Sequence, residues 1–386
     1  MKLSCYVHVP FCARICTYCD FYRIVHDPVW EKRYIEAICT EMDIRFEQLQ
    51  KSHPGEEILL DTIFFGGGTP TVLSSDSWST IVSRLKRYAG FSPDIEFTSE
   101  ANPESSTVEK LSLLTSLGVN RTSFGAQSFN SANLERLGRL HNAEQVGIAV
   151  ANARQVGIDN ISVDLMYGLP DETDASLESD LRTVVSLEPQ HISFYSLMLE
   201  GNVPLRYQVE RREVPLPPDD LIADRYQRAV EFLAQSGYDH YEISNYARDN
   251  QRCRHNLAYW LQRDYIAFGP AAVGTIGSLR YKNEPDIFRY VKNLAVNKLP
   301  VADEEEVTSP KRLIESIMLS LRLSSGLNTD ILKSEFGYDI SGVRRSLIDG
   351  LKSAGDIIEE HDHLLLTTKG MFRADMIASS LLPDFV

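Results

Sequence analysis

Long apolar runs and an excess of positive charge are both missing from the 386 residues of this chain. No stretch approaches the roughly 18 consecutive apolar residues of a membrane-spanning helix, and 54 acidic against 39 basic residues give a formal charge of −15. Because nucleic-acid binding needs a basic face, this charge argues against a general nucleic-acid partner. The start MKLSCYVHVPF is too short and too strand-like for a signal peptide. We therefore expect a cytoplasmic protein without a transmembrane segment.

Cysteine is scarce, with six residues, and three of them fall within one short stretch. Cys12, Cys16 and Cys19 are spaced C-x3-C-x2-C, and three thiolates at this spacing can hold three corners of a 4Fe–4S cluster. Such clusters normally have four Cys ligands, so one iron would stay open to another ligand. The scattered Cys5 and Cys39 are interpreted as small buried apolar residues.

A zinc site is the alternative interpretation of the cysteine loop. It would need a fourth nearby Cys or His in closed tetrahedral geometry. His8 and His26 are the candidates, yet neither lies at a familiar zinc spacing. A disulfide is less expected still, because disulfides are rare in cytosolic proteins.

Apolar segments and helical segments alternate along the first 200 residues. Trp30, Tyr34, Ile38 and Met42 lie four residues apart, which is helical spacing. The apolar segments suggest strands buried on both faces, as in a parallel sheet covered by helices. Right-handed crossovers coil such repeats into a barrel or open barrel, although the pattern alone also fits a doubly wound sheet. Strands are expected at residues 3–9, 58–65, 94–100, 122–127, 160–167 and 191–198.

Glycines and polar residues mark the ends of several expected strands. The turn GGGTP begins at Gly66, and Glu100, Gln127 and Asp164 each stand at or near a strand end. Since parallel barrels build their sites at the carboxyl ends of strands, these residues are site candidates. A polar residue can also simply mark where a strand stops, which explains one or two such positions but not the whole set.

The cysteine loop and these motifs together resemble the radical S-adenosylmethionine (SAM) family, in which the open iron binds the amino and carboxylate groups of SAM. Over nearly its whole length the chain is similar to the oxygen-independent coproporphyrinogen III oxidases (HemN) and their relatives, the HemW haem chaperones. The resemblance implies an α/β fold: an open, partial TIM-type (β/α)6 barrel with a smaller, mainly helical, winged-helix-like C-terminal domain.

The same resemblance implies which residues would bind SAM. In the GGGTP turn, glycine lets main-chain groups approach a ligand, and an arginine would pair with the SAM carboxylate. By family position, the methionine amino end would meet Gly67, Gly68, Thr69 and Glu100, the ribose Gln127 and Asp164, the carboxylate Arg139, and the adenine or methionine surroundings Tyr6, Tyr18 and Met198.

Three features separate the two branches. The oxidases carry C-G-C at the third cysteine, whereas this chain has Cys19-Asp20-Phe21, as the chaperone branch does. The oxidases also have a longer N-terminal arm before the cysteine loop, whereas only eleven residues precede Cys12 here. The segment from His255 to Trp260 matches the H-N-x-x-Y-W motif of HemW. Since a neutral imidazole can ligate haem iron, the resemblance suggests His255 as a haem ligand, with Cys253 as a competitor. From spacing alone, Tyr259 and Trp260 would be aromatic residues of the core, and His255 would be a polar residue whose hydrogen bonds are made within the protein.

These observations predict a haem chaperone that carries a 4Fe–4S cluster and SAM and delivers haem to apo-haemoproteins, with an electron donor for the cluster. The alternatives are oxidative decarboxylation of coproporphyrinogen III and another radical SAM haem-modifying reaction; a homodimer is left open. We expect three parts: a barrel over 1–200, an extension with the haem motif over 201–300, and a C-terminal domain over 301–386.

Four local expectations accompany this division. Residues 203–219 are expected to form a loop and the Gly-rich residues 264–281 to pack on the barrel mouth. The acidic stretch 301–311 is interpreted as an interdomain connection. The C-terminal domain, too acidic to favour DNA phosphate, is interpreted as a cover over that mouth.

Overall fold

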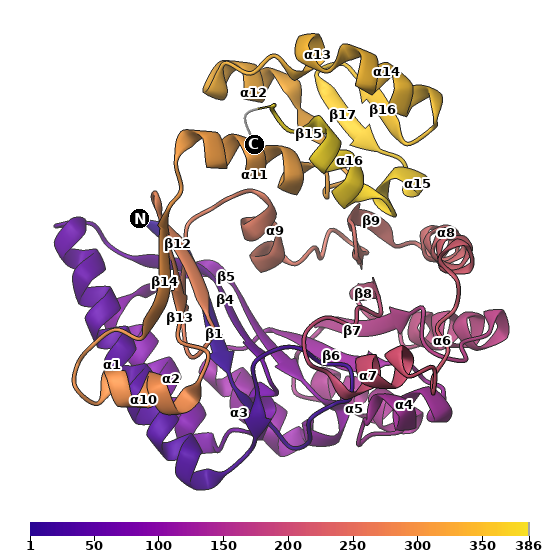
Figure 1. Ribbon diagram of the computed structural model, residues 1–386. Coiled ribbons are helices and arrows are strands. Elements are labelled where there is room, and N and C mark those ends of the chain that lie inside the picture. The colour runs from indigo at the N-terminus through magenta and orange to yellow at the C-terminus, as the bar shows by residue number, and fades with distance from the viewer. Residues whose placement is uncertain (385–386) are drawn as a thin grey trace.

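The computed structural model describes residues 1–384 and contains a strongly curved sheet with helices on its outer side (Figure 1). Six strands pair side by side in parallel and in chain order. This is the open α/β barrel that the sequence predicts, and the doubly wound alternative is wrong, because its strand order would reverse. The six strands are β1 (Lys2–Val9), β4 (Leu59–Gly67), β5 (Gly90–Ala101), β6 (Arg121–Gln127), β7 (Asn160–Tyr167) and β8 (His191–Ser196).

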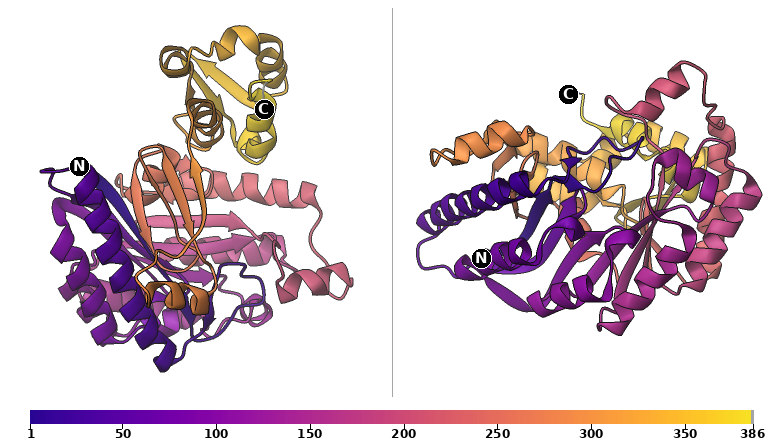
Figure 2. Two further views of the ribbon diagram at one scale, coloured as in Figure 1. Left: turned by 60° about the vertical axis from the view of Figure 1, so that its left-hand side comes forward. Right: turned by 90° about the horizontal axis from the view of Figure 1, so that it is seen from below.

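Helices between these strands cover the outer face of the sheet (Figure 2). Their ends are fixed by local chemistry. The Asp27 side chain accepts the Val29 and Trp30 N–H groups, with Pro28 in the first turn, and Asn142 and Gln145 form a capping box. The helices are α1 (Pro28–Ser52), α2 (Ser75–Tyr88), α3 (Val108–Leu117), α4 (Ser131–Leu137), α5 (Ala143–Gln155) and α6 (Asp174–Ser186).

The strands are not apolar on both faces, contrary to expectation. Ile63 and Phe65 belong to the buried apolar core, whereas their neighbour Thr62 bonds to His255 on the inner face. Along β5 to β7 the inward positions continue as polar residues, including Glu100 and Asp164. The inner face is therefore available for polar ligands, and the sequence pattern is misleading because only one face packs against helices.

Additional strands extend both edges of the barrel. β11 (Tyr265–Phe268) pairs in parallel with β1, followed by antiparallel β12 (Val273–Ile276), β13 (Leu279–Asn283) and β14 (Val301–Glu306). The segment 264–281 is thus part of the sheet rather than packing on the mouth. The expected connection at 301–311 is half strand, so the C-terminal unit begins after Glu306. At the other edge lie β10 (Asn245–Ala247) and β9 (Asp239–Glu242).

The expected loop at 203–219 contains a helix, α7 (Pro204–Glu210). The physical reason is proline at its first position, where the missing N–H costs nothing, together with the buried Leu205. Next come α8 (Asp219–Gln235) along the outside, α9 (Arg254–Trp260) against the inner face of β4, and α10 (Ile287–Leu294) beside α1.

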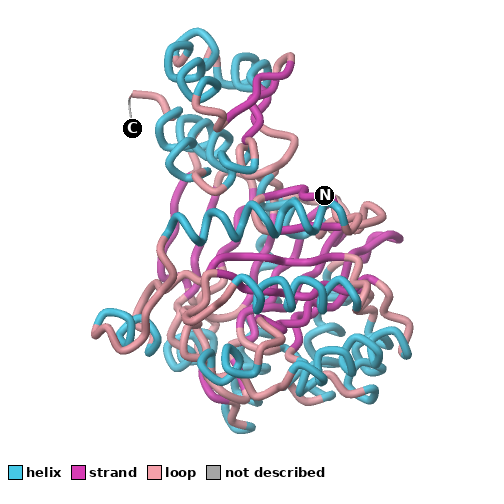
Figure 3. Tube along the Cα trace, turned by 90° about the vertical axis from the view of Figure 1, so that its right-hand side faces the viewer, coloured by secondary structure: helices cyan, strands magenta, loops and turns pink. Residues whose placement is uncertain are grey.

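The C-terminal unit has its own apolar core and a three-stranded sheet, and Figure 3 shows it projecting from the barrel. It lies at the opposite end from the loop after β1, so it is not a cover over that mouth (Figure 1). No helix within residues 1–384 combines the length and apolar character needed to cross a membrane. Its elements are α11 (Ser309–Ser320), β15 (Leu327–Asn328), α12 (Thr329–Phe336), α13 (Ile340–Val343), α14 (Arg345–Ser353), β16 (Ile357–Glu360), β17 (His363–Leu366), α15 (Thr368–Met371) and α16 (Ala374–Leu381).

Candidate functional site

The cysteine loop follows β1 at the carboxyl end of the barrel. Two short strands, β2 (Phe11–Cys12) and β3 (Ile24–Val25), pair in parallel and close its base. The middle is fixed at Thr17, whose N–H donates to the Leu137 carbonyl at 3.1 Å and whose carbonyl accepts the Leu205 N–H at 3.0 Å. Helices α4 and α7 therefore hold the loop in place.

Three thiols on this loop, those of Cys12, Cys16 and Cys19, are partly exposed and unbridged. Burial and, to a smaller extent, the other two sulfurs raise the pKa of Cys12 to about 11, although the Thr69 hydroxyl and the Arg23 charge lower it. The three sulfurs are thus near enough to affect one another's ionisation. Iron binding removes thiol protons, and nearby guanidinium groups favour the resulting thiolates.

Within residues 1–384 no three His, Cys, Asp or Glu side chains gather around a position for a single metal ion. The zinc candidates are engaged elsewhere: His8 bonds to the Tyr6 hydroxyl and the Tyr22 carbonyl, and His26 bonds to Glu31. A set of three loop thiols suits a 4Fe–4S cluster, in which each thiolate binds a different iron.

The glycine turn after β4 packs directly against the cysteine loop. Gly67 has φ +102°, and a Cβ there would lie 2.4 Å from the His8 ring. Gly68 donates its N–H to the Val9 carbonyl at 2.7 Å, and a Cβ there would lie 2.5 Å from the Phe11 carbonyl oxygen. Only glycine fits these two positions. The next residue, Thr69, places its hydroxyl 3.6 Å from Cys12 Sγ.

A chain of contacts runs from the first cysteine to the second. The Thr69 hydroxyl accepts from Asn102 Nδ2 at 3.1 Å, and Asn102 Oδ1 accepts from Arg139 Nη2 at 2.7 Å. Arg139 Nη1 then lies 3.5 Å from Cys16 Sγ. We call Cys12, Thr69, Asn102, Arg139 and Cys16 the thiol-linking chain. It joins the cysteine loop, the glycine turn, the end of β5 and the segment after α4.

The sequence argument missed Asn102. Its signal was present, because Asn102 directly follows β5, two residues after the predicted Glu100. Its hydrogen bonds to two other site residues, Thr69 and Arg139, can be recognised only from the structure.

Two carboxyl groups, those of Glu100 on β5 and Asp164 on β7, lie on the inner side of the sheet. Glu100 accepts the Gly67 N–H at 3.1 Å; burial and the nearby Asp164 charge raise its pKa to about 8. Burial also raises the pKa of Asp164. Hydrogen bonds from the hydroxyls of Ser123, Ser193 and Ser162 and the charge of Arg121 lower it, but by less. A cation or a hydroxyl donor would relieve this arrangement, since buried carboxylates need partners.

The remaining predicted residues lie around this pair with different exposure. Gln127 is buried at a bulge with φ +68°, and its Oε1 accepts the Tyr195 hydroxyl at 2.6 Å. Tyr195, another residue missed from sequence, thereby fixes the amide. Tyr6 and Tyr18 are partly buried, and Tyr18 packs on the small apolar cluster around Leu205. Met198 follows β8 and is 63% exposed.

His255 lies deeper on the inner face and only 1% of it is exposed. Its ring stacks on Phe64, with centres 5.1 Å apart. Its Nδ1 is 2.7 Å from the Thr62 hydroxyl and its Nε2 is 2.8 Å from the Tyr259 hydroxyl. Burial lowers its pKa to about 3, so the ring is neutral. Both nitrogens are engaged, and neither is presented to an iron in this arrangement.

The competing ligand Cys253 is also buried, with its sulfur 3.7 Å from Glu96 Oε1. Cys5 and Cys39 are buried, as the sequence predicts.

Comparison with known proteins identifies relatives along the whole chain. The family model described as the radical SAM superfamily matches residues 6–184. The heme chaperone HemW of Bacillus subtilis is 35% identical, covering 99% of this chain and 99% of the relative. The chain belongs to the HemW family. The heme chaperone HemW of Lactococcus lactis is 32% identical over 99% of the chain and 97% of the relative.

Among solved structures, coproporphyrinogen III oxidase (HemN) from Escherichia coli superposes with a TM-score of 0.85 at 22% identity. The match covers 100% of this chain and 91% of that chain. At this identity the likeness concerns the fold alone, which this chain shares with that protein.

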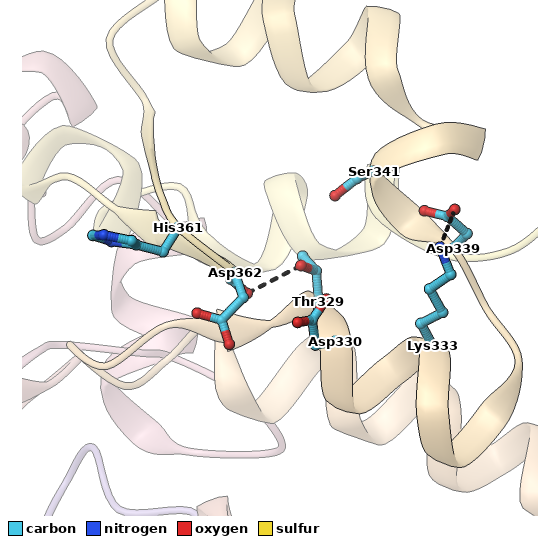
Figure 4. A pocket seen from close by; sticks show the side chains of 7 residues that line it. All are labelled: Thr329, Asp330, Lys333, Asp339, Ser341, His361 and Asp362. Carbon is cyan, nitrogen blue, oxygen red and sulfur yellow. Dashed lines mark hydrogen bonds and ion pairs between the residues drawn. The ribbon is translucent and has the colours of Figure 1, made fainter.

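A separate polar pocket of about 560 Å³ lies in the C-terminal unit, away from these residues (Figure 4). There, Thr329 bonds to the Asp362 carbonyl, and Lys333 pairs with Asp339 at 3.0 Å. None of the site residues predicted from sequence lines it.

Proposed function

We propose that this HemW-family chain is a cytoplasmic haem chaperone that holds a 4Fe–4S cluster and SAM, binds haem and delivers it to apo-haemoproteins. The observation that supports the cluster and SAM sites is the thiol-linking chain. It ties the cysteine loop to the glycine turn and leaves Glu100 and Asp164 beside it. Family membership supports haem as the cargo, because relatives that match over the full chain bear the name heme chaperone.

Each side chain has a defined task in this proposal. Cys12, Cys16 and Cys19 would hold the cluster, which supplies one-electron reduction of SAM when bound. Glu100 would give up its proton and accept a hydrogen bond from the SAM amino group, and Asp164 would accept a hydrogen bond from a ribose hydroxyl.

The other contacts would orient the ligand. Arg139 would meet the SAM carboxylate, because its guanidinium already lies beside the loop thiols. Tyr195 would keep Gln127 turned toward the ribose, while Tyr6, Tyr18 and Met198 would border the adenine and methionine parts.

Cluster binding is tested with Cys16→Ala and the matched control Cys39→Ala, which lies outside the loop. After anoxic reconstitution, we expect Cys16→Ala to lose most bound iron and the broad thiolate-to-iron absorbance near ~400 nm. Cys39→Ala should keep both. Full iron content in Cys16→Ala, or zinc in the wild-type loop, would contradict the cluster.

Chaperone function is separated from the alternative chemistry by two assays. Reconstituted protein with SAM and reductant should leave coproporphyrinogen III unchanged under anoxia. Protein loaded with haem should transfer it to a haem-free b-type cytochrome, restoring the cytochrome spectrum. Formation of protoporphyrinogen without haem transfer would favour the decarboxylase instead.

A further inference from the structure

Apolar side chains gather on the surface beside the cysteine loop. Phe21 is 63% exposed, Val25 55%, Val29 60% and Phe288 55%, and Trp30 is partly exposed. We call these five residues the loop patch. Large apolar residues scattered singly over a surface are ordinary, whereas a contiguous group of them marks an interaction site.

Contacts between α1, α10 and the cysteine loop show that the loop patch is contiguous. The Trp30 ring on α1 packs edge to face against Phe288 on α10, with ring centres 4.3 Å apart. The Tyr22 hydroxyl of the loop accepts the Ile287 N–H at 2.7 Å and so ties the loop to the first residue of α10. Figure 1 shows α10 beside α1, at the same end of the barrel as the cysteine loop.

The loop patch begins next to the thiols themselves. Val25 on β3 is the partner of Cys12 in the pairing of β2 with β3, and Phe21 follows Cys19 by two residues. A redox centre docked here would be separated from a cluster on these thiols by only a few residues. Since electron tunnelling slows steeply with distance, this is a favourable place for an electron to enter.

The charge around the loop patch is opposite in sign to that of the whole chain. Residues 12–33 and 286–298 contain seven Lys or Arg against four Asp or Glu, whereas the complete chain has 39 against 54. Three of the four acids are engaged within the protein: Glu31 is buried and accepts from two serines, and Asp27 and Asp286 cap α1 and α10.

The basic side chains around the loop patch are directed to solvent. Arg14 on the loop, Lys32 and Arg33 on α1, and Arg289 and Lys292 on α10 are all exposed. Complementary charge steers a partner and orients it, and like charge repels it. An apolar centre with a basic rim therefore fits a partner with an acidic rim. A second copy of this chain fits less well, because a symmetric contact would bring two basic rims together.

We propose that the loop patch is the docking surface for an electron donor, a small acidic protein that carries a low-potential one-electron centre. The inference rests on the proposed function, because that function supplies a cluster that has to be reduced. One electron passes from the donor to a cluster held by Cys12, Cys16 and Cys19; the donor is oxidised by one electron, and no bond forms or breaks. Electron-transfer interfaces are small and transient, which suits five apolar side chains with a charged rim.

The first test measures how fast the reconstituted wild-type protein is reduced under anoxia by an acidic flavodoxin in its reduced form, followed by the bleaching of the cluster absorbance. The second-order rate constant should fall about tenfold or more as ionic strength rises from about 0.02 to 0.5 M, because salt screens the attraction. Photoreduced deazaflavin, which is small and uncharged, should reduce the protein at a rate that does not depend on salt. Misfolding cannot mimic this result, because only wild-type protein is used.

Two charge variants locate the surface. Lys32→Glu with Lys292→Glu should slow reduction by flavodoxin about 10–100-fold at low salt, and a calorimetric titration of the oxidised proteins should show a Kd weakened to a similar extent. The control is Lys51→Glu with Arg87→Glu, which changes the total charge equally but lies at the far ends of α1 and α2. The control should stay within about twofold of wild type in both measurements.

Two apolar variants test the centre of the patch. Phe288→Ser should slow reduction by flavodoxin about tenfold at low and at high salt, because a lost apolar contact is not screened. The control Ile148→Ser on α5 removes an apolar side chain that is 51% exposed and should leave the rate unchanged. Deazaflavin should reduce every variant as fast as it reduces wild type.

The outcomes separate the docking surface from the proposed function. Equal rates for the two charge variants, or a wild-type rate that is indifferent to salt, overturn the docking surface and leave the cluster in place. Self-association of the wild type that Phe288→Ser abolishes assigns the patch to a second copy and also overturns it. Wild-type protein that binds no iron, or that deazaflavin cannot reduce, overturns the proposed function itself.

Discussion

At the scale of single residues, the site depends on groups held in states that water would not favour. Glu100 is the clearest case, because burial and the neighbouring Asp164 raise its pKa to about 8. Near neutral pH the folded protein without ligand therefore keeps a proton on Glu100. Ligand binding at this carboxyl and folding stability become linked through that proton.

Glu100→Gln tests this linkage. An unfolded Glu loses its proton near pH 4.5, whereas the folded carboxyl keeps it to about pH 8. Wild-type stability should therefore fall as pH rises through this window, because the folded state binds more protons. The variant lacks this loss, so at pH 8.5 its unfolding free energy should exceed the wild-type value by up to about 5 kcal/mol, seen as a Tm that is about 5–10 °C higher. The two values should converge near pH 5.

The control for this pH series is Glu47→Gln, on the exposed side of α1. It should follow the wild-type curve throughout. Glu100→Gln should also bind SAM about 10–100-fold more weakly, because a charge-assisted hydrogen bond is lost. A variant that shows the same pH dependence as wild type would contradict the raised pKa.

Gly67→Ala separates backbone strain from steric clash. Gly67 and Gly277 both have positive φ, but only a Cβ at Gly67 meets another side chain, the His8 ring, whereas Gly277 faces open space. Gly277→Ala should cost about 1 kcal/mol of unfolding free energy. Gly67→Ala should cost about 3 kcal/mol and prevent cluster reconstitution, measured by urea unfolding and iron content. Equal costs would mean that the turn can move away from His8.

At the scale of elements, α9 is a short helix held by one buried carboxylate. Glu96 on β5 accepts the Arg254 N–H at Oε2 and the His255 N–H at Oε1, both at 2.9 Å. These are orphan donors of a helix N-terminus, which carries partial positive charge. The HNxxYW segment therefore takes its position from a strand about 160 residues earlier.

Glu96→Gln should loosen α9, because an amide can accept with only one oxygen and turns its NH₂ toward the other N–H. We expect a loss of about 1–3 kcal/mol and faster hydrogen exchange of the α9 amides. Asp94→Asn is the matched control, since Asp94 is exposed on the same strand and contacts the Arg254 side chain. Identical exchange in the two variants would show that Glu96 is not the anchor.

The order of the elements could be predicted from sequence, since each barrel strand is an apolar run followed by a helix. The site was predicted in part: Glu100, Gln127 and Asp164 stand at strand ends, where barrels place their chemistry. Asn102 and Tyr195 were missed because each acts through partners that are distant in sequence: Asn102 through Thr69 and Arg139, and Tyr195 through Gln127. The polar inner face was also missed, because a strand's composition does not say which side packs against helices.

At the scale of the whole molecule, the C-terminal unit joins the two edges of the open barrel. At one edge Leu323 bridges to Glu242, the last residue of β9, and at the other Arg280 on β13 pairs with Glu315 on α11. An open sheet leaves unpaired edges that invite aggregation, so covering them has a structural benefit. A cleft of about 360 Å³ lies at the second junction, and hence its shape depends on how firmly the unit is held.

Arg280→Met should weaken that junction. Arg280 binds Glu315 through two contacts of 2.6 and 2.8 Å and Glu305 through one of 3.0 Å. All three side chains are partly exposed, so we expect a loss of about 1–2 kcal/mol in urea unfolding and faster protease cleavage after Glu306. The matched control is Arg182→Met, which removes an exposed pair with Glu178 within α6. That pair should contribute at most about 0.5 kcal/mol. If both variants unfold alike and are cleaved alike, the unit is held by its apolar contacts, and the cleft keeps its shape without these charges.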